Sequence, residues 1–429
     1  GTVTANSVVL ADPDFGGSSS NDSNTRGTLN FGGGILDLQN GTITEGGGTH
    51  LFTFTDGTLK DVDSIGFSVN QQGGIIQIGD DGAIDTMSVD GDFTTTTGAT
   101  LEISLDGQSG AGVAGGHDQL IVDDMAANGT VDLGNATLDL TLNFIPSRGQ
   151  TFVILDNDGT SDPIVGTFAG LVDGEVFDLT STVDGNQYVF QIQYDTEDGT
   201  GAGNNVVLTS FGLAETRVSI VGGDLVIDDF NNESADQLDI SMANISGENY
   251  FVIKDVNSTP LNLTTTIAES DATRVNADEI RVKVSAVSGG LIVNTANPSA
   301  AADIDSVTIS SPFAIGGDLV INAETINLNS NVTTGGSQDY NGAVQLGGSS
   351  SGVTLASSGG GAVDFESTID GNKGLTVNTS GTTRFGGTIG GSVVLASLST
   401  DAAGTTTIAA DVTTTGAMTF GDPVDLVGD

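Results

Sequence analysis

Like residues recur at a fixed spacing in the last third of this sequence. Every ten residues a Leu or a Phe appears, and the two types alternate: Leu355, Phe365, Leu375, Phe385 and Leu395. Two positions before three of them stand Val353, Val363 and Val393, which a strand would place on the same face. The spacing predicts coils of about 20 residues that stack on one another, with two main strands in each coil.

A longer repeat overlies the first one. The segment VTTGGSQDYNGAVQL from Val332 matches VTTTGAMTFGDPVDL from Val412, which begins eighty positions or four predicted coils later. A period near twenty with strands and no helical periodicity is typical of a parallel β-helix, a β-solenoid. If the whole chain formed such coils, they would build an elongated rod on the order of 100 Å long. A set of β-sandwiches, whose strands are also short, is the alternative all-β fold.

Short alternating strands bounded by Gly, Asn and Asp continue through the rest of the chain, as in GGIIQIGDDGAI and ATLEISLDG. Because single cores stop growing at about 250–300 residues, 429 residues imply several modules or a repeat. We predict a first β-helix segment over residues 1–213 and a less regular connecting β-rich module over 214–315. Regular coils follow over 316–429, and we expect them to be cut off at their C-terminal end. GGDLVID at 222–228 and GGDLVIN at 316–322 are near copies, which suggests equivalent entries into two modules.

The composition excludes several classes of function. There are 56 Asp and Glu against 10 Lys and Arg, a formal charge of −46, so the surface lacks the cations that neutralise phosphate. We therefore expect no nucleic-acid partner. With no Cys there are no disulfides, thiolate metal sites or Cys nucleophiles. No apolar run approaches the roughly 18 residues of a membrane span, so we expect no membrane insertion.

Several motifs in order resemble the Gly-rich passenger segment of bacterial autotransporter-type surface proteins. Residues 73–105 carry the GD-aromatic strand followed by GATLEISL. HDQLIV, GNATLDLTL, FVILDNDG and VGTFAGLVDGEVF follow between residues 117 and 177, and YDTEDGTGAGNNVVLT closes the series at 194–209. Extra Thr, Gly and Ala interrupt the family's usual ending there. The resemblance extends from the first of these motifs to the last, and it implies export and a β-helical shaft.

Residues 316–429 are similar to the coils of filamentous-haemagglutinin-like repetitive proteins, on their VTT-G-aromatic-V-L and FGG-IGG signatures. The order of the two kinds of segment is similar to that in large surface proteins of planctomycete-like repeat architecture. The resemblance implies an extracellular protein on the bacterial surface or in a secreted fibre. We also expect this chain to be an internal fragment of a longer protein, because it starts without Met and ends inside a patterned segment. Open strand edges would make other copies or neighbouring repeats its partners, arranged head to tail.

Nothing in the sequence points firmly to catalysis. His50 and His117 are the only histidines, and no nucleophile elbow, P-loop or HExxH motif accompanies them. Acid pairs such as Asp123/Asp124, Asp80/Asp81 and Asp228/Asp229 leave a carbohydrate-active β-helix as an alternative, because glycosidases use paired carboxylates. Adjacent acids on a strand point to opposite faces, however, and 56 acids make chance pairs common. We expect the chain not to be an enzyme.

Calcium is the better chemical hypothesis, although we expect no cofactor to be required. Asp156, Asp158 and Asp162 supply oxygens at alternating positions around Gly159, in the manner of a calcium loop. The twelfth position is Thr167 where an EF-hand has a bidentate Glu. Asp195 and Asp198 form a second acidic turn. An Asx-rich turn without metal is the simpler explanation of both segments, and more so of the second.

Five Asn residues open glycosylation sequons: Asn21, Asn40, Asn128, Asn135 and Asn244. We expect these residues to occupy tight turns or stacked Asn ladders instead, both of which suit a β-helix. The sequence thus predicts a structural component of a fibre or surface layer. The alternatives are an adhesin for a cell-surface glycan or a host protein, with residues 214–315 as its candidate binding segment, and a carbohydrate-active enzyme.

Overall fold

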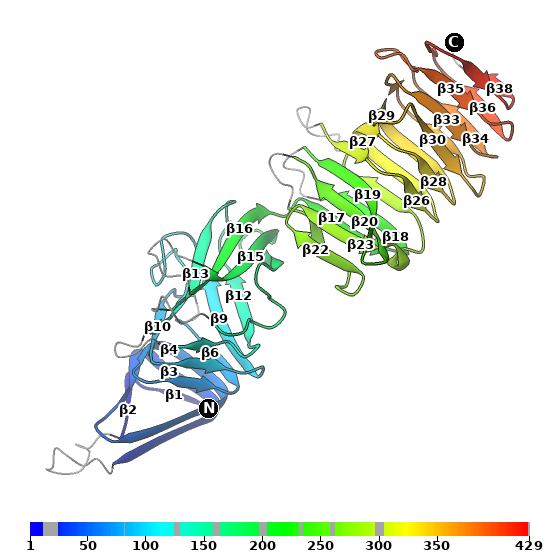
Figure 1. Cartoon of the computed structure of the whole chain (residues 1–429). Helices are drawn as coiled ribbons and strands as arrows, with labels where there is room; N and C mark the ends of the chain where they lie inside the picture. Colours follow the sequence, from blue (N-terminus) through cyan, green and yellow to red (C-terminus); the bar gives the residue numbers. More distant parts are fainter. Residues whose placement is uncertain are drawn as a thin grey trace. The chain divides into compact units, whose positions relative to one another are not determined.

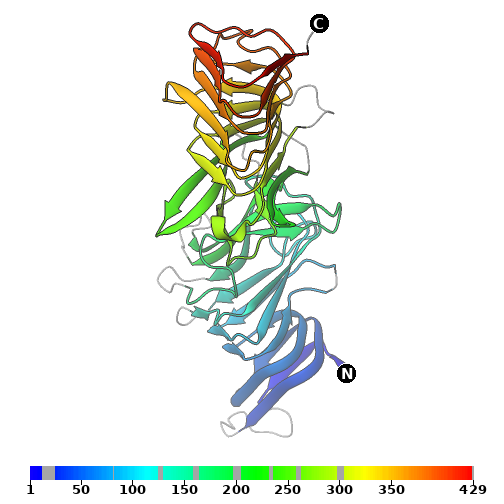
Figure 2. The same cartoon turned by 90° about the vertical axis from the view of Figure 1, so that its right-hand side faces the viewer.

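The computed structural model describes residues 1–11, 25–80, 82–123, 129–157, 164–196, 204–230, 235–257, 262–296 and 304–427. The described residues confirm the all-β prediction, because the one helical segment among them is a 3-10 turn at Val284–Ala286. No helix in this part of the chain has the length and apolar character needed to cross a bilayer. Contacts divide the chain into two units, Gly1–Leu213 and Ala214–Asp429 (Figure 1 and Figure 2).

Unit 1 forms one large curled sheet. Its strands are β1 (Thr2–Thr4), β2 (Ser7–Leu10), β3 (Arg26–Glu45), β4 (Thr49–Ile65), β5 (Val69–Gln71), β6 (Gly74–Gln77), β7 (Thr86–Asp90), β8 (Phe93–Thr95), β9 (Ala99–Leu105), β10 (Gln119–Asp123), β11 (Val131–Asp132), β12 (Thr137–Leu142), β13 (Thr151–Asn157), β14 (Val176–Thr180), β15 (Gln187–Thr196) and β16 (Asn205–Leu213).

Parallel pairing dominates the first part of unit 1. The long strands β3 and β4 bend at bulges, and each contributes to three parallel ladders. These ladders continue through β7, β10 and β13, through β5, β8 and β11, and through β6, β9 and β12. The step between paired residues is not constant: Val69 pairs with Phe93, and Phe93 pairs with Val131 across a much longer stretch of chain. Insertions between strands therefore vary the predicted step of twenty.

The last part of unit 1 departs from the predicted winding. β13 pairs in parallel with β10 but antiparallel with β16, and β14, β15 and β16 pair antiparallel in sequence. The turn between β14 and β15 is short, and Asp184 accepts hydrogen bonds there from the backbone of Asn186 (3.0 Å) and the hydroxyl of Tyr188 (2.7 Å). A short connection allows only antiparallel pairing, because parallel neighbours need a long crossover.

Unit 2 contains a second large sheet and a separate six-stranded sheet. Its strands are β17 (Thr216–Val221), β18 (Asp224–Asp229), β19 (Gln237–Ile245), β20 (Glu248–Asp255), β21 (Thr264–Thr265), β22 (Ala272–Asn276), β23 (Glu279–Lys283), β24 (Leu291–Asn294), β25 (Ser306–Ile309), β26 (Phe313–Ile315), β27 (Leu319–Leu328), β28 (Val332–Thr334), β29 (Gln338–Leu346), β30 (Gly352–Ser357), β31 (Val363–Phe365), β32 (Ile369–Asp370), β33 (Gly374–Asn378), β34 (Thr382–Phe385), β35 (Ser397–Thr400), β36 (Thr405–Ile408), β37 (Met418–Phe420) and β38 (Val424–Leu426).

Unit 2 begins with antiparallel hairpins. β17 and β18 are joined by Gly222 and Gly223, both at positive φ (63° and 100°). Ser246 and Gly247 make the same kind of turn between β19 and β20, with φ of 53° and 91°. Two-residue turns with positive φ match the twist of paired strands. β20, β23 and β22 extend this antiparallel sheet.

From residue 306 onward all paired strands are parallel. The chain contributes to three ladders in a fixed order. The first is the six-stranded sheet from β26 to β37, and the second runs through β27, β29, β31, β34, β36 and β38. The third joins β25, the second halves of β27 and β29, and β32, and continues through bridges to Ile389 and Val412. The prediction of two main strands in each repeat is corrected, because the chain passes through three ladders in turn.

The step between paired residues varies around the predicted value. Among the shortest steps in these ladders is that from Thr406 to Val424, and among the longest is that from Val344 to Ile369. The two steps lie on either side of the predicted twenty. The sequence therefore predicted the approximate step between paired residues, and the turns between strands make each step slightly shorter or longer.

The three ladders also correct our interpretation of the longer repeat. Val332 lies on the six-stranded sheet, whereas its match Val412 bridges to Ile389 on the third ladder. Tyr340 lies on the second ladder, whereas its match Phe420 lies on the six-stranded sheet. The eighty-residue repeat therefore does not bring the chain back to the same ladder. Its matching segments lie on different ladders.

The ten-residue spacing does correspond to stacking between coils. Phe365 pairs with Phe385 in register, and Tyr340 continues the column with ring centroids 5.1 and 5.4 Å apart and nearly parallel planes. All three rings are fully buried. The Leu column is displaced, because Leu355 pairs with Val377 and not with Leu375. The step between paired residues is slightly longer than twenty at this point, so Leu375 pairs with Val353 and Leu355 with Val377.

The two near copies of GGDLVI lie in the same ladder rather than at the entries of two modules. Leu225 pairs with Leu291, and Leu291 pairs with Leu319, so the copies are two rungs apart. The next side chains along these strands point outward and form a column linked by amide hydrogen bonds. Asn341 donates to Asn322 (2.8 Å), Asn322 to Asn294 (2.7 Å) and Asn294 to Asp228 (2.8 Å). Like residues thus stack on the surface as well as in the core.

The predicted turn role of the sequon residues is confirmed for the three that the structure describes. Asn40 and Asn135 have left-handed backbones, with φ of 60° and 63°. Asn244 accepts a hydrogen bond from the backbone of Gly247 (3.2 Å) in the β19–β20 turn. Asn21 and Asn128 lie outside the described residues.

One pair of Val residues tests the register of the coils. Val363 is fully buried, whereas Val393, which the sequence places on the same inward face, is 46% exposed. We expect Val363→Ala to lower the free energy of unfolding of unit 2 by about 2 kcal/mol through lost burial and a cavity. Val393→Ala should change it by less than about 0.5 kcal/mol. Urea unfolding followed by far-UV circular dichroism measures both, and equal losses would contradict this register.

Candidate functional site

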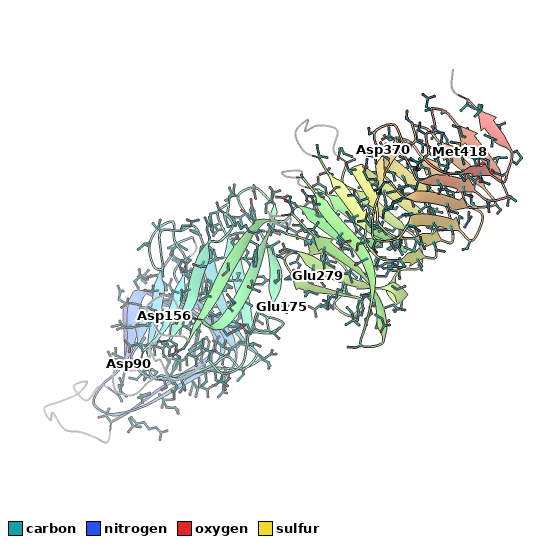
Figure 3. The ribbon with its side chains drawn as sticks, turned by 45° about the horizontal axis from the view of Figure 1, so that its top comes forward. Asp90, Asp156, Glu175, Glu279, Asp370 and Met418 are labelled. Atoms are coloured by element: carbon teal, nitrogen blue, oxygen red, sulfur yellow. The ribbon has the colours of Figure 1, made fainter. Side chains whose placement is uncertain are left out.

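The predicted calcium ligands lie largely outside the described residues. Asp156 is half-buried near the end of β13, paired with Ile121 (Figure 3). Asp158, Asp162 and Asp198 are not described, and Asp195 is described only as part of the backbone of β15. The calcium hypothesis for both loops stays a prediction. Among the described side chains, no three or more His, Asp and Glu are grouped so that they could hold a metal ion.

The two His side chains lie in different surroundings. His50 stacks on Phe67 with ring centroids 4.3 Å apart, and its Nδ1 lies 2.6 Å from Glu45 Oε2. His117 is buried, and its Nε2 lies 3.1 Å from the carbonyl oxygen of Val153. Burial lowers the pKa of His117, which favours the neutral ring. His117 Nδ1 is buried and has no hydrogen-bond partner among the described residues.

Of the three acid pairs that the sequence singled out, only Asp228/Asp229 has both members among the described residues. Asp228 is held in the amide ladder by Asn294 and lies 4.0 Å from the guanidinium of Arg217. In β18, Asp228 pairs with Arg217 and Asp229 with Thr216, so the two carboxylates belong to successive ladder positions. Asp81 and Asp124 lie outside the described residues.

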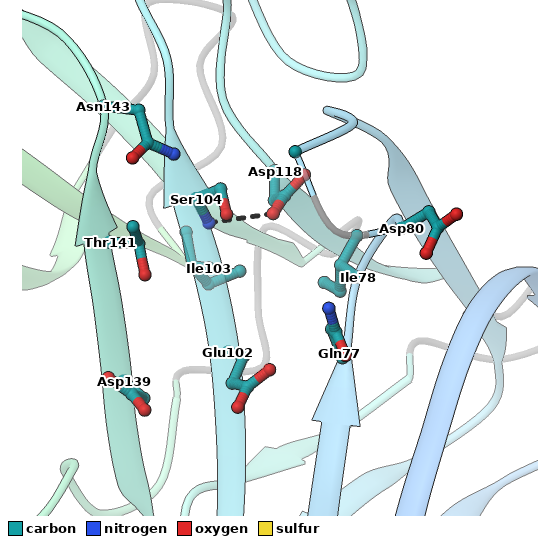
Figure 4. Close-up of a pocket in the computed structure, with 11 residues that line it drawn as sticks. Gln77, Ile78, Asp80, Glu102, Ile103, Ser104, Asp118, Asp139, Thr141 and Asn143 are labelled. Atoms are coloured by element: carbon teal, nitrogen blue, oxygen red, sulfur yellow. Dashed lines mark hydrogen bonds between the residues drawn. The ribbon is translucent and has the colours of Figure 1, made fainter. Parts of the chain in front are cut away.

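The structure instead brings acids together in a pocket of about 270 Å³ in unit 1 (Figure 4). The pocket lies along β6, β9 and β12, whose outward positions carry Gln77, Glu102 and Asp139 in register. The inward neighbours Ile76 and Leu101 are buried in the core, so strand alternation turns these polar side chains outward. The other lining residues are Ile78, Asp80, Gly82, Ile103, Ser104, Asp118, Thr141 and Asn143.

Asp118 is the most buried of the four carboxylates in the pocket, with 1% exposure. It precedes β10 and accepts two backbone hydrogen bonds, from Asp85 (2.9 Å) and from Ser104 (2.8 Å, dashed in Figure 4). Burial outweighs these bonds and, with the carboxylates of Asp106 and Asp85, raises the pKa of Asp118 to about 7. A carboxyl that exchanges its proton near neutral pH therefore faces a polar pocket.

The pocket offers mainly hydrogen-bond acceptors. Glu102 and Asp139 are neighbours on adjacent parallel strands, and Asp80 lies 2.5 Å from the ammonium of Lys60. Hydroxyl and amide groups come from Ser104, Thr141 and Asn143. No aromatic or cationic side chain is among the described lining residues. Such a lining suits a ligand that is rich in O–H or N–H donors, and it could also attract cations.

Sequence reasoning missed this pocket, although one signal for it was present. ATLEISL and ATLDLTL align so that Glu102 faces Asp139, and the ladder pairs them in that alignment. Asp118 carried no signal, because its burial depends on a crossover that brings Ser104 and Asp85 to it. No family model matches this chain, and neither a curated protein nor a solved structure does.

The raised pKa of Asp118 predicts a pH dependence of stability. The folded state holds the proton up to about pH 7, whereas the unfolded carboxyl releases it near its usual value of 3.8. The free energy of unfolding should therefore fall as pH rises from about 4 to about 7, by at most about 1.4 kcal/mol per pH unit from this group. Above about pH 7 its contribution should be constant.

Asp118→Asn should remove this slope from the unfolding of unit 1. Chemical unfolding at several pH values measures the difference between variant and wild type, which cancels the other acids. Asp139→Asn, at an exposed position of the same pocket, is the control and should leave the slope unchanged. Identical slopes for wild type and Asp118→Asn would refute the assignment.

Proposed function

We propose that this chain is a structural component of an extracellular fibre or bacterial surface layer, and a part of a larger secreted repetitive protein. In this proposal its parallel ladders form a β-helix with coils of about 20 residues, and it acts by stacking coils and subunits. The resemblance to autotransporter-type and haemagglutinin-like proteins supports it. So does the additive geometry of the ladders, in which each rung contacts only its neighbours.

One observation carries the proposal, and it concerns the edge formed by β37 and β38. Leu398 is fully buried and pairs with Met418, which is 43% exposed (Figure 3). Ile408 is 8% exposed and pairs with Leu426, which is 76% exposed. Side chains of the same columns are thus buried in one rung and exposed to solvent in the next.

Among the described residues, the rung of β37 and β38 presents a strand edge and an apolar strip. Val424, Leu426 and Val427 are all exposed there. Unpaired strand edges are templates for pairing with another strand. We propose that a further rung covers them, from a neighbouring repeat or from another copy in head-to-tail contact. The contact would not close on itself, so it would extend a fibre.

The charge of the chain supports an extended, soluble assembly. A formal charge of −46 opposes close lateral packing of copies, whereas an end contact buries little of that surface. An adhesin is the second candidate, because the pocket between Glu102, Asp118 and Asp139 presents acceptors that a glycan's hydroxyl groups could meet. A carbohydrate-active enzyme would use the same carboxylates. We do not favour it, because the described lining has no aromatic platform.

The open rung predicts self-association that depends on Leu426. We expect the wild-type chain to show concentration-dependent association in sedimentation velocity at physiological ionic strength. Leu426→Asp should weaken it at least about tenfold, because a charge would enter an apolar contact without a partner. Val172→Asp, at a position in unit 1 that is 57% exposed, is the control. A wild-type chain that stays monomeric at high concentration would count against the head-to-tail contact.

A further inference from the structure

A Gly-rich loop joins β9 to β10 in unit 1. Its sequence over residues 107–116 is GQSGAGVAGG, and backbone hydrogen bonds fold it back on itself. The N–H of Ser109 donates to the carbonyl of Gly115 (3.0 Å), and that of Gly116 donates to the carbonyl of Val113 (2.9 Å). No residue from 108 to 115 is buried, and Val113 is 47% exposed. The loop itself therefore makes little apolar contact with the core.

His117, at the end of this loop, supplies the contact that the rest of the loop lacks. The residue is only 6% exposed, and its ring packs edge-on against Phe152 with centroids 5.4 Å apart. Its backbone N–H donates to the carbonyl of Gly110 (3.2 Å), and its carbonyl accepts from the N–H of Gly112 (3.0 Å). One residue therefore holds the loop through its backbone and reaches β13 through its side chain.

The ring nitrogen that meets β13 carries a hydrogen. His117 Nε2 lies 3.1 Å from the carbonyl oxygen of Val153, and a carbonyl can only accept. The side chain of Gln119 donates to the same oxygen (2.9 Å). Both side chains bind at an irregular point of the strand, because the ladder between β13 and β16 shifts its register between Val153 and Leu155. A neutral His117 ring therefore has its one N–H on Nε2.

The other ring nitrogen is the one that acid would protonate. Nδ1 of the neutral ring carries a lone pair, it is buried, and no described residue bonds to it. A proton on Nδ1 would create a buried N–H without an acceptor in the described part of the chain, together with a positive charge. Both changes carry a large cost in a buried position. The ring avoids this cost when it leaves its place and meets water.

The charged groups around the ring do not offset that cost. The elements packed against His117 carry carboxyl groups and no Lys or Arg: Glu102 and Asp106 in and after β9, Asp118 and Asp123 before and in β10, and Asp156 in β13. Burial lowers the pKa of His117, the bond to Val153 opposes this, and no carboxylate is among the causes of the shift. The described surroundings of the ring therefore favour its neutral form.

We propose that His117 is a pH-sensitive latch: its neutral ring fastens the loop of residues 106–116 to β13, and its protonation in acid releases the loop. No other side chain between residues 106 and 116 is buried, so the loss of this one contact frees the loop. The backbone bonds within the loop then break one by one, because few contacts to the core support them.

The latch also acts on the acid pocket. Asp118 follows His117 directly and lines that pocket together with Ser104. The N–H of Asp118 donates to the carbonyl of Ser104 (2.9 Å), and the N–H of Ser104 donates to Asp118 Oδ2 (2.8 Å). Release at His117 loosens the chain next to these two bonds. The wall of the pocket therefore changes with pH whatever ligand the pocket takes.

Hydrogen exchange of the whole chain tests the latch. Mass spectrometry reads the amides of residues 107–117 between about pH 5 and about pH 7.5, after correction for the intrinsic effect of pH on exchange. The released ring takes a proton below about pH 6.5, whereas the buried ring does not, so acid favours the open loop. We expect the opening equilibrium to rise by up to about thirtyfold from about pH 7.5 to about pH 5.

Two variants make the result specific. His117→Gln keeps an N–H donor for the carbonyl of Val153 but takes no proton in this range, so its loop should open equally at both ends of the range. Asp118 is present in both proteins, and its own proton, which acts in the opposite direction, cancels in the comparison. His50→Gln removes the other His of the chain and should keep the wild-type response.

Nitrogen-15 NMR of the His rings keeps the test decisive if His117→Gln fails to fold. The chain has two His residues, so the signals that His50→Gln lacks belong to His50 and the others to His117. We expect His117 of the wild type to carry its hydrogen on Nε2 at about pH 7.5. Its ring should stay neutral in the closed loop as the pH falls.

Three results would overturn the latch. Loop exchange that does not change with pH in the wild type would show that His117 holds the loop in either charge state. An equal rise in wild type and His117→Gln would assign the response to another group. A His117 ring with its hydrogen on Nδ1 at about pH 7.5 would contradict the bond to Val153 on which the proposal depends.

Discussion

The structure depends on one constraint: in its parallel ladders each side chain lies over the equivalent residue of the next rung. In-register stacking favours residues that attract their own kind. Phe365 over Phe385 gains ring contact with every added rung, and Asn294 under Asn322 gains an amide hydrogen bond. The core and the amide ladder are therefore two results of the same geometry. Neither depends on long-range folding of the chain, because each rung needs only its neighbours.

The same constraint penalises like charges, and this chain has 56 acids. Its corners show how the penalty is reduced. In unit 2, Asp236 and Asp305 precede paired residues of β19 and β25, and the backbone N–H of Asp236 donates to Asp305 (2.8 Å). The N–H of Asp305 in turn donates to Glu324 (3.0 Å). Backbone donors do not suffice everywhere, since burial and Asp229 raise the pKa of Asp236 to about 8. Buried acids with acidic neighbours therefore favour a proton, as at Asp61 and Asp118 in unit 1.

The sequence predicted the stacking better than the register. The spacing of Phe365 and Phe385 reported a true column, because no residue is inserted between those rungs. Val393 obeys the same spacing but is exposed, because a strand that the pattern implied is replaced there by a bridge at Leu395. The longer repeat matches segments on different faces, which strand alternation alone cannot reveal. The acid pocket was unpredictable for a different reason: Glu102 and Asp139 resemble many other outward acids until the register places Asp118 beside them.

Antiparallel strands and open rungs have opposite consequences for such a ladder. An antiparallel neighbour, such as β16 beside β13 or β20 beside β19, takes up the strand edge but does not present the same side-chain column to a further rung. A parallel edge keeps the column and remains competent for addition. In the described chain, the edge of β37 and β38 is of the second kind, with Leu426 in the column that Ile408 occupies when covered. Parallel addition thus keeps each side-chain column available to a further rung, and this property links the fold to the structural role that we propose.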